Sequence, residues 1–185
     1  METQVRFIPD DRINKSKPRL KNFSELFYLY ADALFYPDKD FFKLLKELGY
    51  TKLLNEIESL EEVQNQYVSL FEFNLKGIEC VPFGSYWYDK RLLGREALKL
   101  KRFYEKCGFK FNVMEFKMPW DYISIELSFL ANLIENKNYK AAREMIEKHM
   151  GWIEKFKECL RTKSKVYYTI VRGVCELINR FVEEE

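Results

Sequence analysis

The sequence has very little histidine: His149 is the single one among 185 residues. Catalytic arrangements of the serine–histidine–aspartate or cysteine–histidine kind would all depend on it. It lies near the expected C-terminal end of a helix, where a histidine can interact with the helix dipole. The sequence also lacks HExxH, GxxxxGK[ST] and GxGxxG motifs, which removes the usual signatures of zinc, nucleotide and dinucleotide sites. We therefore predict a binding protein without a catalytic site, metal or cofactor.

An excess of one charge is missing too, because 31 Lys and Arg against 29 Asp and Glu leave a net charge of +2. This balance argues against nucleic acid as the main partner. The charges are unevenly placed, with nine acidic and five basic residues in 38–79 but eight basic and three acidic residues in 89–110. The pattern indicates a dipolar surface, and the alternative is that these charges only solvate helix faces.

Long apolar runs are also absent. No run approaches the ~20 residues that span a bilayer, and the N-terminus lacks the basic start and apolar run of a signal peptide. The cysteines form no CxxC pair and have no metal-ligand spacing; they are Cys80, Cys107, Cys159 and Cys175. We predict a cytoplasmic protein with reduced thiols and no direct membrane insertion.

The sequence is rich in helical patterning. Its hydrophobic fraction of 47% can fill one core, and no alternating strand pattern of useful length is present. The 3.6-residue period predicts helices over residues 22–36, 38–48, 51–73 with a break near Ser59, 92–107, 121–135, 139–150, 151–161 and 166–182. We expect an all-α fold of seven to nine helices in one domain over residues 19–185, preceded by a flexible arm over residues 1–18.

Local signals set several of these boundaries. Asn22 with Glu25, and Ser59 with Glu62, form capping-box patterns that predict helix starts. Gly49 follows an apolar helical pattern and predicts a left-handed helix stop. The helix over 121–135 carries apolar residues on more than one face, which predicts a central position in the fold.

One connecting segment, VPFGSYWYDKRLLG at residues 81–94, concentrates aromatic residues. We expect a loop in which Pro82 and Gly84 fix a turn and the Ser85 hydroxyl bonds to the backbone. Two interpretations of its rings are open: they line a binding surface, or they fold inward and seal the core. The rings are those of Phe83, Tyr86, Trp87 and Tyr88.

Four segments, in order, resemble the TorD/DmsD/NarJ family of redox enzyme maturation chaperones. They are YVSLF (67–71), PFGSYWYD (82–89), GREALKLKRFYEKCGF (94–109) and PWDYISIELSFLANL (119–133), within a resemblance over roughly 20–181. In the last segment Asp121 keeps the family's acid, but Tyr122 stands where the family usually has histidine. A phenol does not change charge near neutral pH, so recognition here would depend on contact area more than on proton sharing.

The resemblance implies an all-helical chaperone, not an enzyme. Such a protein binds the twin-arginine signal peptide or the body of a molybdopterin oxidoreductase catalytic subunit, with molybdenum or tungsten, until the cofactor is inserted. This client offers an apolar segment and two guanidinium groups, so its receptor needs an apolar groove with a carboxylate at the edge. The expected client-binding residues are Tyr67, Phe71, Pro82, Phe83, Ser85, Tyr86, Trp87, Tyr88, Asp121, Tyr122 and Glu126.

Several of these residues also have a purely structural interpretation. Tyr67 and Phe71 can belong to the core, and Asp121 can cap the helix that follows it. A buried Glu126 would need a partner, for which we expect an arginine or a tyrosine hydroxyl. Asp121 and Glu126 are about 140° apart around a helix, so they converge only with the help of another element.

Two other functions compete with the chaperone hypothesis. The first is a general helical adaptor that binds an amphipathic partner helix and has no role in cofactor assembly. The second is an enzyme such as a nucleotide hydrolase, which the missing phosphate-binding loop disfavours. We expect a monomer; the alternative is a dimer in which chains exchange helices through the segment 74–91.

Overall fold

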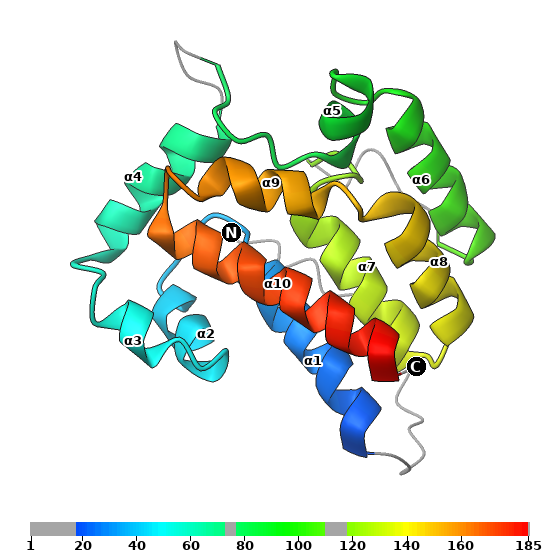
Figure 1. Ribbon diagram of the computed structural model, residues 1–185, viewed down its shortest axis with the longest axis horizontal. Coiled ribbons are helices and arrows are strands. Elements are labelled where there is room, and N and C mark those ends of the chain that lie inside the picture. The colour runs from blue at the N-terminus through cyan, green and yellow to red at the C-terminus, as the bar shows by residue number, and fades with distance from the viewer. Residues whose placement is uncertain (1–17, 73–76, 110–117, 185) are drawn as a thin grey trace.

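Ten helices and no strand form the part of the chain that the computed structural model describes, residues 18–72, 77–109 and 118–184 (Figure 1). The helices are α1 (Pro18–Ala33), α2 (Phe41–Glu47), α3 (Thr51–Leu54), α4 (Leu60–Phe71), α5 (Gly84–Asp89), α6 (Arg95–Lys106), α7 (Ile123–Glu135), α8 (Tyr139–His149), α9 (Ile153–Leu160) and α10 (Lys165–Glu184). The all-α prediction is confirmed. The count exceeds the expected seven to nine because the aromatic segment contains α5.

Helix α7 is the centre of the fold. Every residue from Ile123 to Ile134 is buried, because α1, α8 and the segments around α5 cover its different faces. Helix α10 packs against α1 and α9 on the side that faces the viewer in Figure 1. The prediction that the most apolar helix is central is confirmed, since only a helix surrounded by others can bury all its faces.

The local signals at helix ends have mixed outcomes. The break near Ser59 is confirmed: Glu62 N donates to Ser59 Oγ (3.1 Å) at the start of α4. Gly49 has a φ of 81°, the left-handed value expected at a helix stop. The predicted start at Asn22 is wrong, since α1 already begins at Pro18, and proline is favoured at a first helical position. The arm predicted over 1–18 lies outside the described residues, apart from Pro18.

A disulfide joins the chain ahead of α5 to α9. It links Cys80 with Cys159, whose Cα atoms are 5.9 Å apart, while Cys107 and Cys175 are free. The expectation of four reduced thiols is therefore wrong for this pair. The two cysteines are 79 positions apart in the sequence, so no local spacing signals their pairing. Within the described ranges, none of the helices combines the length and hydropathy needed to cross a membrane.

Candidate functional site

The aromatic segment is a short helix, α5, fastened to the start of α7. Gly84 N donates to Asp121 O (2.9 Å) and Ile123 N donates to Pro82 O (3.0 Å), which pairs the backbones around Phe83 and Tyr122 in an antiparallel bridge. The expectation of a loop is wrong here, because this pairing fixes the N-terminus of α5 and lets its six residues form a helix.

Asp121 caps α5 rather than its own helix. Its Oδ2 accepts a hydrogen bond from Ser85 N (2.9 Å), in the first turn of α5, and the side chain is only 1% exposed. Tyr122 is the N-cap residue of α7 and makes no side-chain cap bond. The predicted N-cap role of Asp121 is thus wrong: its carboxylate satisfies a neighbouring helix. The Ser85 backbone, not its hydroxyl, makes the bond, and the hydroxyl has no partner among the described residues.

Glu126 is also buried, on the first turn of α7. Its Oε2 accepts from the Trp152 indole Nε1 (3.2 Å), and its Oε1 has no partner among the described residues. The expected arginine or tyrosine partner is therefore wrong. Burial, and then the nearby charge of Asp121, raise the pKa of Glu126 well above its ordinary value. A protonated Glu126 follows from this environment, because an isolated ionised carboxylate is costly to bury.

The two carboxyl groups share one small cavity of about 10 Å³, which α5 closes. Gly84 is essential to the fit, because a Cβ there would lie 2.9 Å from Glu126 Oε1 and 2.8 Å from Trp152 Nε1. Asp121 lies before the first turn of α7 and Glu126 lies within it. The two carboxyl groups come together at α5, which is the additional element expected from the sequence. The cavity is lined by Gly84, Ser85, Tyr88, Glu96, Leu100, Asp121, Glu126 and His149.

His149 ends α8, as predicted, and contributes an aromatic contact. Its ring centroid is 5.2 Å from that of Phe103. Burial lowers the pKa of His149 below its ordinary value. Its neutral form is favoured for this reason, so the sole histidine lies at the cavity as a packed ring.

Tyr122 donates from its hydroxyl to Leu34 O (2.7 Å) and lies 2.7 Å from the Tyr67 hydroxyl, which therefore donates to it. Burial raises the pKa of Tyr122 well above its ordinary value, so the phenol stays neutral. Tyr67 and Phe71 are 4% and 6% exposed and belong to the core. The phenol that stands in the place of histidine is thus a structural link between α7, α4 and the end of α1.

Four predicted residues remain at the surface. Phe83, Tyr86 and Trp87 are half-buried and Tyr88 is 41% exposed. Trp87 Nε1 donates to Val81 O (2.8 Å), and the Lys90 ammonium lies 5.6 and 5.7 Å from the centroids of the Tyr86 and Trp87 rings. Both interpretations of the segment are therefore partly realised: Phe83 and Trp87 pack against the core, and all four residues keep an accessible part.

Sequence reasoning missed two aromatic neighbours, Phe35 and Tyr36, which follow α1. The Phe35 ring centroid is 5.7 Å from that of Tyr122, and the exposed Tyr36 ring is 5.4 Å from that of Tyr67. The sequence contained a signal for them. A helix usually ends at or before the residue that precedes a proline, so Pro37 predicts that Phe35 and Tyr36 lie at or just after the helix end. The remaining predicted residues are buried around the same junction of α4, α5 and α7; they are Tyr67, Phe71, Pro82, Ser85, Asp121, Tyr122 and Glu126.

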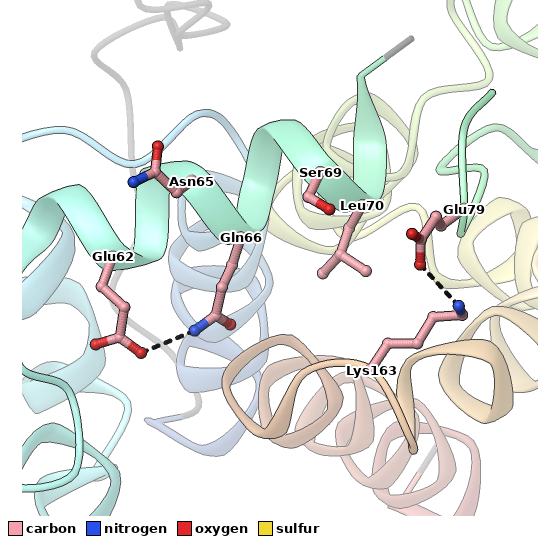
Figure 2. A pocket seen from close by; sticks show the side chains of 7 residues that line it. All are labelled: Glu62, Asn65, Gln66, Ser69, Leu70, Glu79 and Lys163. Carbon is pink, nitrogen blue, oxygen red and sulfur yellow. Dashed lines mark hydrogen bonds and ion pairs between the residues drawn. The ribbon is translucent and has the colours of Figure 1, made fainter. Parts of the chain in front are cut away.

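A separate open pocket of about 410 Å³ lies between α4 and the turn that joins α9 to α10. Figure 2 shows Leu70 pointing from α4 toward Lys163, whose ammonium pairs with the Glu79 carboxylate at 2.7 Å. Gln66 Nε2 donates to Glu62 Oε1 (3.0 Å) at the other end. The pocket is lined by Glu62, Asn65, Gln66, Ser69, Leu70, Glu79 and Lys163.

Comparison with known proteins places this arrangement in a family. Residues 39–168, from the residue before Asp40 into α10, match the family described as nitrate reductase delta subunit. The chain belongs to this family. It is a family of redox enzyme maturation chaperones rather than of catalytic enzymes, which confirms the resemblance seen in the sequence. The matched range includes the whole junction of α4, α5 and α7.

A solved structure supports the same assignment. It is a protein from Archaeoglobus fulgidus described as a redox enzyme maturation protein, with 25% sequence identity and a TM-score of 0.64. The alignment covers 94% of this chain and 99% of that one. A comparison with curated proteins found no match. In the described part of the chain, no group of three His, Cys, Asp or Glu side chains could hold a metal ion.

Proposed function

We propose that this chaperone acts in the cytoplasm, where it binds the twin-arginine signal peptide of a molybdopterin oxidoreductase subunit and holds the client until its cofactor is inserted. The observation that carries the proposal is the short helix α5 with its N-cap residue Phe83, which together present four partly accessible aromatic rings and are fixed to the start of α7 by buried hydrogen bonds. An aromatic surface on a fixed support suits an apolar peptide segment, because little side-chain entropy is lost on binding.

The roles within the predicted site divide by burial. Phe83, Tyr86, Trp87 and Tyr88 are the residues that we expect to contact the client, since parts of their rings are accessible. The buried Asp121, Tyr122 and Glu126 hold α5 in place, and direct contact between them and a client would require α5 to move away. Phe35 contacts the buried Tyr122 ring, which also contacts Phe83, and Tyr36 contacts Tyr67, so we expect these two residues to add to the client-binding surface.

The arginine pair of a signal peptide would bind at the pocket of Figure 2. Glu79 and Lys163 form a partly exposed ion pair, with side-chain exposures of 32% and 37%. A client guanidinium can replace the Lys163 ammonium, because its planar fork binds a carboxylate through two parallel hydrogen bonds. Leu70 offers an apolar surface for the aliphatic part of the arginine side chain.

Substitution of the α5 aromatics tests the first part. We expect Tyr86→Ala and Trp87→Ala each to weaken binding of a twin-arginine signal peptide by about 1–3 kcal/mol, the range for aromatic anchors at interfaces. Isothermal titration calorimetry measures the affinity, and thermal unfolding confirms that each variant is folded. Phe42→Ala is the matched control, since Phe42 is a half-buried aromatic on α2, far from α5 in Figure 1. Normal binding by folded Trp87→Ala would contradict the proposal.

Substitution of Glu79 tests the pocket. Glu79→Gln should lower affinity for the same peptide by about 1.5–3 kcal/mol, the value of a hydrogen bond between charged groups. Replacing both peptide arginines by lysine should cause a similar loss in the wild type and little further loss in the variant. Glu56→Gln is the control, because Glu56 forms a comparable ion pair with Lys165 elsewhere on the surface. The pocket has no role in arginine binding if Glu79→Gln and Glu56→Gln behave alike.

A further inference from the structure

Exposed apolar side chains gather around the connection between α5 and α6. In the described part of the chain, four of the six large hydrophobic residues with a strongly exposed side chain fall within positions 88–98. They are Tyr88 (41% exposed), Leu92 (46%), Leu93 (51%) and Leu98 (48%). Single exposed leucines are ordinary, but a cluster of them marks an interaction surface.

The turn that contains Leu92 and Leu93 is fixed by a hydrogen bond and by close packing. Asp89 Oδ2 accepts a hydrogen bond from Glu96 N (2.8 Å), in the first turn of α6. Gly94 lies against this carboxylate so closely that a Cβ there would be 2.3 Å from Asp89 Oδ2. The two leucines are therefore presented to the outside by a defined turn rather than by a loose loop.

Leu93 has a strained backbone conformation that its packing does not compensate. Its φ is 53°, in the left-handed region that is unfavourable for a branched side chain. Half of the side chain is exposed, so burial offsets little of this strain. A strained apolar residue at a surface turn points to a contact outside the folded chain.

Basic residues surround these leucines. Residues 89–102 include six basic and two acidic residues, although the whole chain has a net charge of only +2. Both acidic groups are already engaged, since Asp89 caps α6 and Glu96 pairs with Lys99. Arg91, Arg95 and Arg102 are exposed and have no ion pair among the described residues; on α6, Arg95, Leu98 and Arg102 share one outer face.

The geometry points to a membrane-surface site: the turn Lys90–Gly94 and the outer face of α6 bind anionic lipid headgroups, with Leu92 and Leu93 inserted at the interface. Basic residues bind lipid phosphates, and apolar side chains on a protruding turn enter the headgroup region. Neither of the two pockets described above is lined by these leucines, so a protein partner would itself have to supply a groove.

This site adjoins the proposed signal-peptide site, since Tyr88 belongs to both surfaces, but the leucines and arginines named here are separate from the rings and carboxylates proposed to bind the peptide. The two arginines of a signal peptide are attracted to the carboxylates of Figure 2, whereas the basic residues around α6 attract anionic lipid headgroups. The contact is peripheral, since the described helices include none that could cross a membrane. Peripheral binding would bring the chaperone and its client to the membrane surface.

Vesicle flotation with the full chain tests the inference. We expect binding to vesicles of phosphatidylcholine with about 30 mol% phosphatidylglycerol, none to pure phosphatidylcholine, and weaker binding at high salt. The double variant Leu92→Ser, Leu93→Asn should lose about tenfold in vesicle affinity and stay folded, because asparagine tolerates the left-handed conformation. Arg95→Gln with Arg102→Gln should lose about 25-fold, near fivefold for each charge.

A charge-matched control tests whether vesicle binding depends on this surface or only on the number of positive charges in the protein. Lys43→Gln with Lys46→Gln also removes two exposed charges, but from α2, on the opposite side of the molecule in Figure 1. It should bind vesicles like the wild type. The inference is overturned if the wild type does not float with anionic vesicles, or if the leucine variant and the α2 variant behave alike. Loss of signal-peptide binding in the leucine and arginine variants, without vesicle binding by the wild type, would instead identify a protein-docking surface.

Discussion

Replacing Cys80 or Cys159 by serine is expected to lower the free energy of unfolding by about 2–5 kcal/mol. The disulfide closes a long loop, because its cysteines are 79 positions apart, and a cross-link over a long loop removes much entropy from the unfolded chain. Urea unfolding with and without a dithiol measures the effect. The wild type should lose stability when reduced, whereas the serine variants should respond little to the dithiol.

Cys107→Ser is the matched control for this experiment, because Cys107 is free and half-buried. It should unfold like the wild type and keep the response to the dithiol. Equal unfolding midpoints for the oxidised wild type and Cys159→Ser would show that the bond contributes nothing to stability. Reduction should also weaken peptide binding, since the disulfide fixes the residue directly before Val81 and Pro82 to α9.

The second large effect concerns Glu126 and pH. In the folded protein the pKa of Glu126 is raised, so the native state keeps a proton that the unfolded chain releases above about pH 4.5. Its contribution to stability is complete below that pH and is lost as pH rises toward the folded pKa. The loss amounts to about 1.4 kcal/mol per pH unit for one proton.

Glu126→Gln should remove this dependence. Glutamine cannot ionise, and its carbonyl oxygen can still accept the hydrogen bond from Trp152 Nε1. The stability of the variant relative to the wild type should therefore rise by about 1.4 kcal/mol per unit between pH 5 and the folded pKa of Glu126. Urea unfolding at a series of pH values measures the difference. Glu105→Gln, on the exposed face of α6, is the control, and parallel curves for wild type and Glu126→Gln would refute the assignment.

These predictions use contacts that no sequence pattern contained. The Cys80–Cys159 bond, the Trp152–Glu126 hydrogen bond and the Tyr67–Tyr122 hydroxyl pair join residues 79, 26 and 55 positions apart. Residue type alone suggested that Glu126 needs a partner, but its identity depended on which helix packs against α7. The partner of Asp121 also depended on packing. Its carboxylate could have capped α7 or α5, and the way that the two helices pack places it at the first turn of α5.

The sequence alone was sufficient for the helical class, the central position of α7, the break at Ser59, the stop at Gly49 and the family. Each depends on residues within a few turns of one another, where the 3.6-residue period, capping hydrogen bonds and left-handed glycines act locally. The tertiary structure decided that α5 is a helix, that Tyr122 is buried, which cysteines pair, and that a pocket forms beside Glu79 and Lys163. These features require segments distant in sequence to be packed together, and the free energy of that packing is a property of the whole core.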